Sequence, residues 1–276
     1  MPPVNLIKGS ISELKGAASG LNRLHLCLLI LLVTKNVHAE LRFITTVEPP
    51  TNYVHEGKFS GMTTEIVKAI RDQLGWSNQV EVYPWARGYQ LALTTPNSVI
   101  FTAGKTPERV AAGFYFVGPV STRQHVVFTR SGQESIEVED IRRSQIPIAG
   151  LRGGWRGKHL SNQGFNIIAT TEHDQGFRML MNRRINYWIS SDMEAPMIAK
   201  KWGYRMSDLK IAWMIKEAKS YMAISPGSSQ HLITRWETTY QALQKQDFFP
   251  KEVTRWSDIL DADVKFSETS GYIIHH

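Results

Sequence analysis

The sequence predicts an α/β fold in which short strands and helices alternate along the chain. Short segments rich in β-branched and aromatic residues recur along the sequence, and between them lie segments whose apolar residues repeat at helical spacing. Alternation of this kind favours a mixed α/β fold over an all-α or all-β fold. The alternation restarts after residue 130, so we expect two α/β blocks of roughly a hundred residues each.

The first block shows the alternation clearly. Its expected elements are a strand at 41–47, a helix at 63–74, a strand at 79–83, a helix at 86–93 and a strand at 98–102. The first helix carries its apolar residues at helical spacing, and Gly75 ends it. Farther on, Pro107 is placed to open a helical turn ahead of the apolar aromatic run 114–119.

The second block repeats the pattern. A strand at 124–130 leads into it, and further strands are expected at 146–149, 166–169, 187–189 and 220–225. Helices are expected after Gly154, at 172–181 and at 193–202, and then after Ser228, which we expect to cap the next helix, and at 252–260.

The chain start predicts a secretory leader, residues 1–39, and therefore a periplasmic protein. Residues 1–23 are weakly basic, residues 24–33 are apolar, and Val37-His38-Ala39 fits a cleavage site. The apolar run is shorter than the ~20 residues of a membrane span, although an uncleaved anchor is the alternative. The single cysteine, Cys27, lies in this leader, so the mature chain is expected to have no thiol.

Composition excludes several classes of protein. Without the leader, 28 basic residues face 24 acidic ones, and a net charge of +4 is not the footprint of a nucleic-acid binder. The histidines show no i, i+4 pair, so no metal site is predicted, and no other cofactor is expected. There is no Gly-x-Ser-x-Gly segment, which argues against a serine hydrolase of that class.

The stretch Thr106-Pro107-Glu108-Arg109 is the first candidate for binding. It stands before the run Phe114–Pro119, so the Arg109 guanidinium is expected at the edge of a packed strand. The planar guanidinium can hold a carboxylate through two parallel hydrogen bonds. The alternative is a surface arginine paired with Glu108 or another neighbour.

Several motifs in order resemble one family. They are Val47-Glu48-Pro49-Pro50, Gly61-Met62-Thr63-Thr64-Glu65-Ile66, Pro84-Trp85-Ala86-Arg87, Thr106-Pro107-Glu108-Arg109, Phe116-Val117-Gly118-Pro119, Gly150-Leu151-Arg152-Gly153-Gly154 and Arg183-Arg184-Ile185-Asn186-Tyr187-Trp188. Together they resemble the extracytoplasmic solute-binding proteins that serve polar amino-acid uptake. The resemblance covers nearly all of residues 40–262.

The resemblance implies a type II periplasmic-binding-protein clamp, in which two α/β lobes joined by two hinge strands close over a ligand. Lobe one would comprise residues 40–127 and 224–276, and lobe two residues 128–223. The chain would cross between the lobes near 126–130 and 221–225. The implied partners are a small amino acid or organic acid and the permease of an inner-membrane ABC transporter, and the protein is expected to be a monomer that binds no nucleic acid.

The resemblance also implies ligand-binding residues in lobe one. Arg109 matches the arginine that grips the ligand carboxylate, and Thr102 to Gly104 would line the same cleft with backbone amides. Tyr53, or a neighbour in the loop from Pro49 to His55, matches the place of an aromatic that covers the ligand, and the alternative is a loop aromatic that packs on its own lobe. Two further candidates are Trp85, as a stacking wall or a core residue, and Arg87, as a second anion contact.

In the second block, Gly153 and Gly154 allow backbone amides to approach an anion at a helix start, and Trp155 can close over it. The alternative is an ordinary strand-to-helix turn.

Asp192 is where the chain departs from the family pattern. The family commonly places an aspartate that pairs with the ligand's amino group five residues after the first aspartate of its motif. Here Asn186 replaces that first aspartate, Ser191 stands five residues later, and Asp192 follows. Either a bulge brings Asp192 to the cleft, or the ammonium partner is absent and an organic acid or another anion is the better ligand.

The predicted function is therefore a periplasmic solute-binding protein, not an enzyme, that captures a small carboxylate ligand, an amino acid in the first instance, for an ABC transporter. Two alternatives stay open. One is a cyclohexadienyl-dehydratase-like enzyme on the same fold, with Glu48, Glu65, Asp192 or Glu194 as acid or base. The other is a periplasmic sensor that presents its ligand to a receptor.

Overall fold

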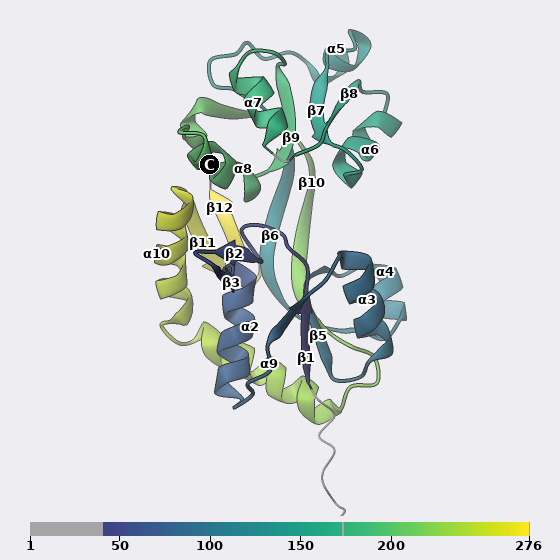
Figure 1. Ribbon diagram of the computed structural model, residues 1–276, viewed down its shortest axis with the longest axis vertical. Helices are drawn as coiled ribbons and strands as arrows, with labels where there is room; N and C mark the ends of the chain where they lie inside the picture. Colours follow the sequence, from purple (N-terminus) through teal and green to yellow (C-terminus); the bar gives the residue numbers. More distant parts are fainter. Residues whose placement is uncertain (1–40, 173, 276) are drawn as a thin grey trace, which may run out of the picture. The chain divides into compact units, whose positions relative to one another are not determined.

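A mixed β-sheet flanked by helices forms the structure, a computed structural model that describes residues 41–172 and 174–275 (Figure 1). The α/β fold class is confirmed, whereas the predicted leader at 1–39 lies outside the described residues. The strands are β1 (Arg42–Thr45), β2 (Tyr53–His55), β3 (Lys58–Ser60), β4 (Val80–Val82), β5 (Ser98–Gly104), β6 (Tyr115–Arg130), β7 (Ile148–Leu151), β8 (Ile167–Thr170), β9 (Tyr187–Ser191), β10 (Leu209–Ile224), β11 (Asp263–Ser267) and β12 (Gly271–His275).

The helices lie mostly between successive strands, as the alternation of the sequence predicts. They are α2 (Met62–Gln73), α3 (Trp85–Thr94), α4 (Pro107–Ala111), α5 (Val138–Arg143), α6 (Trp155–Asn162), α7 (Gln175–Met181), α8 (Glu194–Lys201), α9 (Gln230–Gln244) and α10 (Phe248–Leu260), with a short 3₁₀ helix at Met206–Asp208. Parallel neighbours such as β1 and β5, or β7 and β9, need such crossovers because their chain directions match.

The strands β6 and β10 join two sections of the sheet, whose order is β4-β1-β5-β10-β6-β9-β7-β8. They pair antiparallel from Tyr115 opposite Ile224 to Arg130 opposite Leu209 (Figure 1). At one end β10 also pairs with β5, and at the other end β6 pairs with β9 through His125–Phe128. Between these neighbours, Thr122, Arg123 and Gln124 of β6 lie opposite Lys219, Ala218 and Glu217 of β10.

Clusters of buried hydrophobic side chains lie against both sections of the sheet. Phe43, Ile66 and Trp236 are buried in a core beside β1 and β5, whereas Phe128, Phe177 and Trp188 are buried in one beside β6 and β9. Burial of such side chains, at about 1.5–3 kcal/mol each, is the main driving force that stabilises both sections. The division into two blocks, the lobe boundaries and the crossing points remain predictions.

The two long strands are longer than predicted. The sequence predicts strands at 124–130 and 220–225, whereas β6 begins at Tyr115 and β10 at Leu209. Charged residues in the middle of β10, such as Lys216 and Glu217, hide the strand because they do not alternate with buried apolar ones. The hairpin of β11 and β12 is also absent from the prediction.

The predicted cap of α9 is wrong by one residue. The Ser229 side chain, not that of Ser228, accepts the hydrogen bond from the Leu232 amide, at 3.2 Å. Ser228 instead bonds to the Ser225 hydroxyl at 2.9 Å and accepts from the Asn97 amide at 2.9 Å. Neighbouring serines have equal cap propensity, so the tertiary contact to Asn97 decides which one caps.

The loop between β1 and β2 is fixed against the start of α2. The amides of Met62 and Thr63 donate to the carbonyls of Pro50 and Thr51, each at 3.1 Å. Gly61 allows this approach: its φ is 138°, and a Cβ added there would lie 2.2 Å from the Thr51 oxygen. The position of this loop therefore depends on Gly61.

Gly61→Ala should destabilise the protein by about 2–4 kcal/mol, because the new Cβ meets backbone atoms and the residue takes a strained φ. Urea unfolding followed by circular dichroism measures the loss. Gly57→Ala is the matched control in the adjoining hairpin: its φ is also positive, at 73°, but no described atom lies within 4 Å of the added Cβ. Its expected cost is only about 1–2 kcal/mol. Equal losses for the two variants would contradict the role of close approach at Gly61.

Candidate functional site

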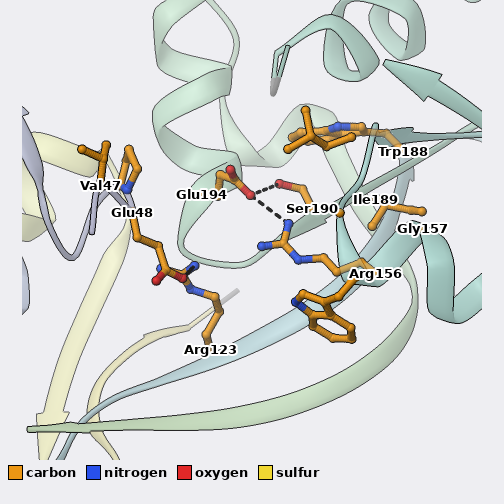
Figure 2. Close-up of a pocket in the computed structure, with 13 residues that line it drawn as sticks. Val47, Glu48, Arg123, Arg156, Gly157, Trp188, Ile189, Ser190 and Glu194 are labelled. Atoms are coloured by element: carbon orange, nitrogen blue, oxygen red, sulfur yellow. Dashed lines mark hydrogen bonds and ion pairs between the residues drawn. The ribbon is translucent and has the colours of Figure 1, made fainter. Parts of the chain in front are cut away.

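A cavity of about 420 Å³ lies where the two sections of the sheet meet. The β1–β2 loop contributes Val47, Glu48 and Pro49, and β6 contributes Arg123. The remaining lining residues come from the end of β7, the start of α6, β9 and α8: Leu151, Gly154, Trp155, Arg156, Gly157, Trp188, Ile189, Ser190 and Glu194 (Figure 2).

Two ion pairs place charge around this cavity. Nη1 of Arg123 donates to Oε1 of Glu48, and Nη1 of Arg156 donates to Oε2 of Glu194 at 3.0 Å. The Ser190 hydroxyl donates to the same Glu194 oxygen at 3.2 Å (Figure 2). The cavity thus offers two guanidinium groups and two carboxylates to a ligand.

Aromatic and aliphatic side chains supply the rest of the cavity wall. Trp155 stands edge-on to the His125 ring, with 4.9 Å between ring centroids, and yet it remains 47% exposed. Trp188, Ile189 and Leu151 also line the cavity. Most of the wall is therefore apolar, as is usual for sites that bind small molecules.

His125 is a buried neutral histidine behind the cavity. Burial, together with the positive charges of Arg156 and Arg123, lowers its pKa to about 3. Its Nδ1 has no hydrogen-bond partner among the described residues. The ring therefore stays uncharged near neutral pH and leaves the arginines as the cations here.

The structure brings Arg109, Trp85 and Gly104 together at the carboxyl end of β5. Nη1 of Arg109 donates to the Gly104 carbonyl at 2.6 Å, and the guanidinium carbon lies 4.7 Å from the Trp85 ring centre and 5.4 Å from that of Tyr89. Burial lowers the pKa of Arg109. In the part of the chain that the structure describes, no ion pair joins Arg109 to Glu108, and Arg109 does not line the cavity. Its ligand-binding role remains a prediction.

The other predicted ligand-binding residues on the β4-β1-β5 side of the sheet do not line the cavity. Tyr53 is buried, with its ring centre 6.3 Å from that of Trp256, so it packs on its own section. Thr102 accepts a hydrogen bond from Nδ2 of Asn52 at 2.7 Å and has a φ of 61°, which is unusual for a β-branched residue. Arg87 is exposed, with its guanidinium 4.9 Å from the Tyr83 ring centre.

Of the glycine turn, Gly154 and Trp155 line the cavity, whereas Gly153, with a φ of 72°, stands just before it. The turn does lead from a strand, β7, into the first turn of α6, as expected. It therefore presents the helix N-terminus, together with Trp155 and Arg156, to the cavity.

Asp192 is buried beside the cavity rather than in its lining. Its Oδ1 accepts hydrogen bonds from the amides of Met193, at 2.7 Å, and Gln124, at 3.0 Å. Burial raises its pKa to about 7 despite these two bonds and the nearby Arg123. The carboxylate that lines this side is Glu194, and the ammonium-binding role of Asp192 remains a prediction.

Sequence reasoning missed the two arginines of the cavity. Arg123 and Arg156 belong to no motif, and Glu48 and Glu194 were candidates only for an enzyme. One signal was present: Arg123 is the one lysine, arginine, aspartate or glutamate inside β6, whose last residue is Arg130, and a buried charge there needs a partner. The partner itself, 75 residues earlier in the sequence, is visible only in the fold.

Two further classes of site find no support in the described residues 41–172 and 174–275. No group of three histidine, cysteine, aspartate or glutamate side chains is placed to hold a metal ion. Within the same residues, every helix is too short or too polar to span a bilayer.

Comparison with known proteins gives a family. The model of the bacterial extracellular solute-binding proteins, family 3, matches residues 41–264. No curated protein sequence matches the chain.

Solved structures give the same fold at low sequence identity. A mutant of ArgBP from T. maritima is 18% identical over 79% of this chain and 95% of its own, with a TM-score of 0.59. The unliganded, open L-cystine solute receptor of Neisseria gonorrhoeae is 17% identical over 81% and 95%, with a TM-score of 0.59. A histidine kinase sensor domain with similarity to periplasmic binding proteins is also 17% identical over 81% and 95%, with a TM-score of 0.56. These similarities show the type II periplasmic-binding-protein fold.

Asp192→Asn should remove a pH dependence of stability. The folded pKa of about 7 exceeds the ordinary value of about 3.9, so the folded protein binds more protons between these pH values. The stability that Asp192 contributes is full below pH 4 and is lost as pH rises through 7. Asparagine keeps an Oδ1 acceptor, so the variant should match wild type near pH 4 and exceed it by up to about 4 kcal/mol above pH 7.

Urea unfolding at pH 4, 5.5, 7 and 8 measures this difference between Asp192→Asn and wild type. The control is Asp258→Asn, which replaces an exposed aspartate. An Asp192→Asn protein that is less stable than wild type at pH 8 would show that the ionised carboxylate is the stabilising form.

Proposed function

Since this chain belongs to the bacterial extracellular solute-binding proteins, family 3, we propose that it binds a small amino acid or a related acid and delivers it to an ABC transporter. The observation that carries the proposal is the cavity between the two sections of the sheet. It combines paired guanidinium and carboxylate groups with an apolar wall, and its volume of about 420 Å³ suits a ligand of this size.

The groups around the cavity are complementary to a zwitterion. The guanidinium groups of Arg123 and Arg156 can bind the ligand's carboxylate, and the carboxylate of Glu48 or Glu194 can bind its amino group. Trp155 can pack against an apolar side chain of the ligand. An amino acid therefore satisfies both kinds of charge, and an organic acid satisfies one.

We further propose that the two sections are lobes, with residues 40–127 and 224–276 in one and 128–223 in the other, and that β6 and β10 act as hinge strands. Closure would bring Arg109 to the ligand. The Arg109 guanidinium is held by Trp85, Tyr89 and the Gly104 carbonyl, and its remaining donors have no partner among the described residues. A guanidinium fixed in this way loses little entropy when it binds a carboxylate.

The proposal also includes a periplasmic location, removal of residues 1–39 and delivery of the ligand to a membrane permease.

A sensor role is the second candidate, because the histidine kinase sensor domain shares the fold. Enzyme activity on a cyclic acid is the third outcome, with Glu48 or Glu194 as acid or base. Each of these carboxylates faces an arginine, an arrangement that suits the binding of charge.

Thermal unfolding with the twenty proteinogenic amino acids and a set of small organic acids tests the proposal. At a ligand concentration of 100 times Kd, binding to the folded protein adds about 2.7 kcal/mol of stability, so a saturable rise in Tm is expected for one chemical group of ligands. Chromatography of the same mixtures should recover the ligand unchanged. Turnover would establish an enzyme instead, and no rise with any amino acid or acid would contradict the proposal.

Arg109→Ala should weaken binding of the ligand found in this way by about ten- to a hundredfold, since a charge-assisted hydrogen bond contributes about 1.5–3 kcal/mol. Isothermal titration calorimetry measures the change. Arg235→Ala is the matched control, because Arg235 also stacks on a tryptophan, at 5.3 Å from the Trp76 ring centre, away from the cavity. Unchanged affinity in Arg109→Ala would refute the assignment of Arg109 to the ligand.

A further inference from the structure

We propose that Arg123 is an anion-binding residue of the cavity and that Glu48 is its internal counter-ion, which the acidic group of a ligand displaces. The proposal rests on the proposed function, because it names the chemistry by which the same cavity holds its ligand.

Arg123 is a buried cation with unused hydrogen-bonding capacity. Its side chain is only 6% exposed, and Glu48 is its one ion-pair partner among the described residues. Glu48 engages Nη1, whereas Nη2 is buried without a hydrogen-bond partner in the same part of the chain. Because a guanidinium can hold a carboxylate with two parallel bonds, the observed pair leaves part of this capacity unused.

The two partners of this ion pair differ in how they are held. Arg123 lies in β6 opposite Ala218 of β10. The pairing of these two strands fixes the backbone of Arg123. Glu48 lies in the β1–β2 loop, and its side chain is 37% exposed. The loop backbone is fixed, with the Glu48 amide donating to the Asn52 carbonyl at 2.7 Å, but the carboxylate reaches solvent. The Glu48 side chain can therefore turn away, whereas Arg123 cannot.

The second ion pair of the cavity lacks this asymmetry. The side chains of Arg156 and Glu194 are 19% and 11% exposed, and Glu194 also accepts the Ser190 hydroxyl. Separating this pair would leave a covered carboxylate without its cation, which is costly. An incoming anion therefore opens the Arg123–Glu48 pair first.

The surroundings define the chemical class of ligand. A group that replaces the Glu48 carboxylate must itself be a small anion such as a carboxylate. The same cavity is lined by Trp155, Leu151 and Ile189, whose side chains favour an apolar or aromatic body in the ligand. The cavity thus takes a small acid with an apolar or aromatic body, and an amino acid of that kind falls within this class.

The displacement mechanism predicts that loss of the Glu48 charge increases the affinity for an acid. If Glu48 competes with the ligand, removal of its charge should strengthen binding of an acid, because Arg123 is then free for the ligand. If Glu48 merely supports the cavity, the same change should weaken binding or leave it unaltered.

Calorimetric titration of the full chain with phenylacetate and with phenylacetamide, its uncharged analogue, tests the proposal. We expect wild type to bind phenylacetate at least tenfold more tightly than phenylacetamide. Glu48→Gln should bind phenylacetate about tenfold more tightly than wild type, and Arg123→Gln at least tenfold more weakly. Glu81→Gln is the matched control: it removes the carboxylate of the Arg42–Glu81 ion pair, outside the cavity, and should leave binding unchanged.

Several results would overturn the proposal: weaker or unaltered binding of phenylacetate in Glu48→Gln, equal binding of the acid and the amide by wild type, or no binding of phenylacetate at millimolar concentration. Circular dichroism checks that Arg123→Gln is folded. If it is unfolded, the direction of the affinity change in Glu48→Gln tests the proposal by itself. Amino acids that raise Tm while Glu48→Gln leaves their affinity unaltered would keep the proposed function and remove this inference. Binding of phenylacetate without any amino acid would keep the inference and revise the function.

Discussion

The antiparallel pairing of β6 with β10 is the constraint on which the rest of the structure depends. These strands carry the only sheet hydrogen bonds that run from the β4-β1-β5 section to the β9-β7-β8 section within the described residues. The core beside β1 and β5 also includes Met193 at the start of α8, so side-chain packing adds a second link between the sections. The cavity exists because these two strands bring the β1–β2 loop and the start of α6 to the same place. Motion between the sections, where it occurs, must be taken up by this pair of strands.

Charge pairing explains the composition of the cavity. A guanidinium covered as deeply as that of Arg123 is stable only beside a counter-ion, and Glu48 supplies it from another section of the sheet. In the β9-β7-β8 section, Glu194 neutralises the charge of Arg156 in the same way. The charges of the two arginines and the two glutamates around the cavity therefore balance. A ligand enters by exchanging partners with these groups, so affinity depends on how readily each internal pair opens.

Arg109 is held by aromatic rings and a carbonyl group, whereas Arg123 is held by a carboxylate. The guanidinium lies against two aromatic rings and one carbonyl, without a carboxylate partner in the described part of the chain. Nearby, Thr102 takes a positive φ while its hydroxyl accepts a bond from Asn52, which also accepts one from Thr64. A β-branched residue adopts such a backbone only when its surroundings hold it there. These contacts tie the end of β5, beside Arg109, to the β1–β2 loop that carries Glu48.

The sequence by itself determined the α/β class, the order of most elements and the glycine turn before α6, because these follow from local periodicity and backbone preference. Its ordered motifs indicated the family, and Trp155 was correctly placed at the start of a helix. Only the tertiary structure decided the length of β6 and β10, the choice of Ser229 over Ser228 as a cap, and the pairing of Arg123 with Glu48. Each of these depends on partners far apart in the chain, and no local pattern encodes which distant residue will neutralise a buried charge.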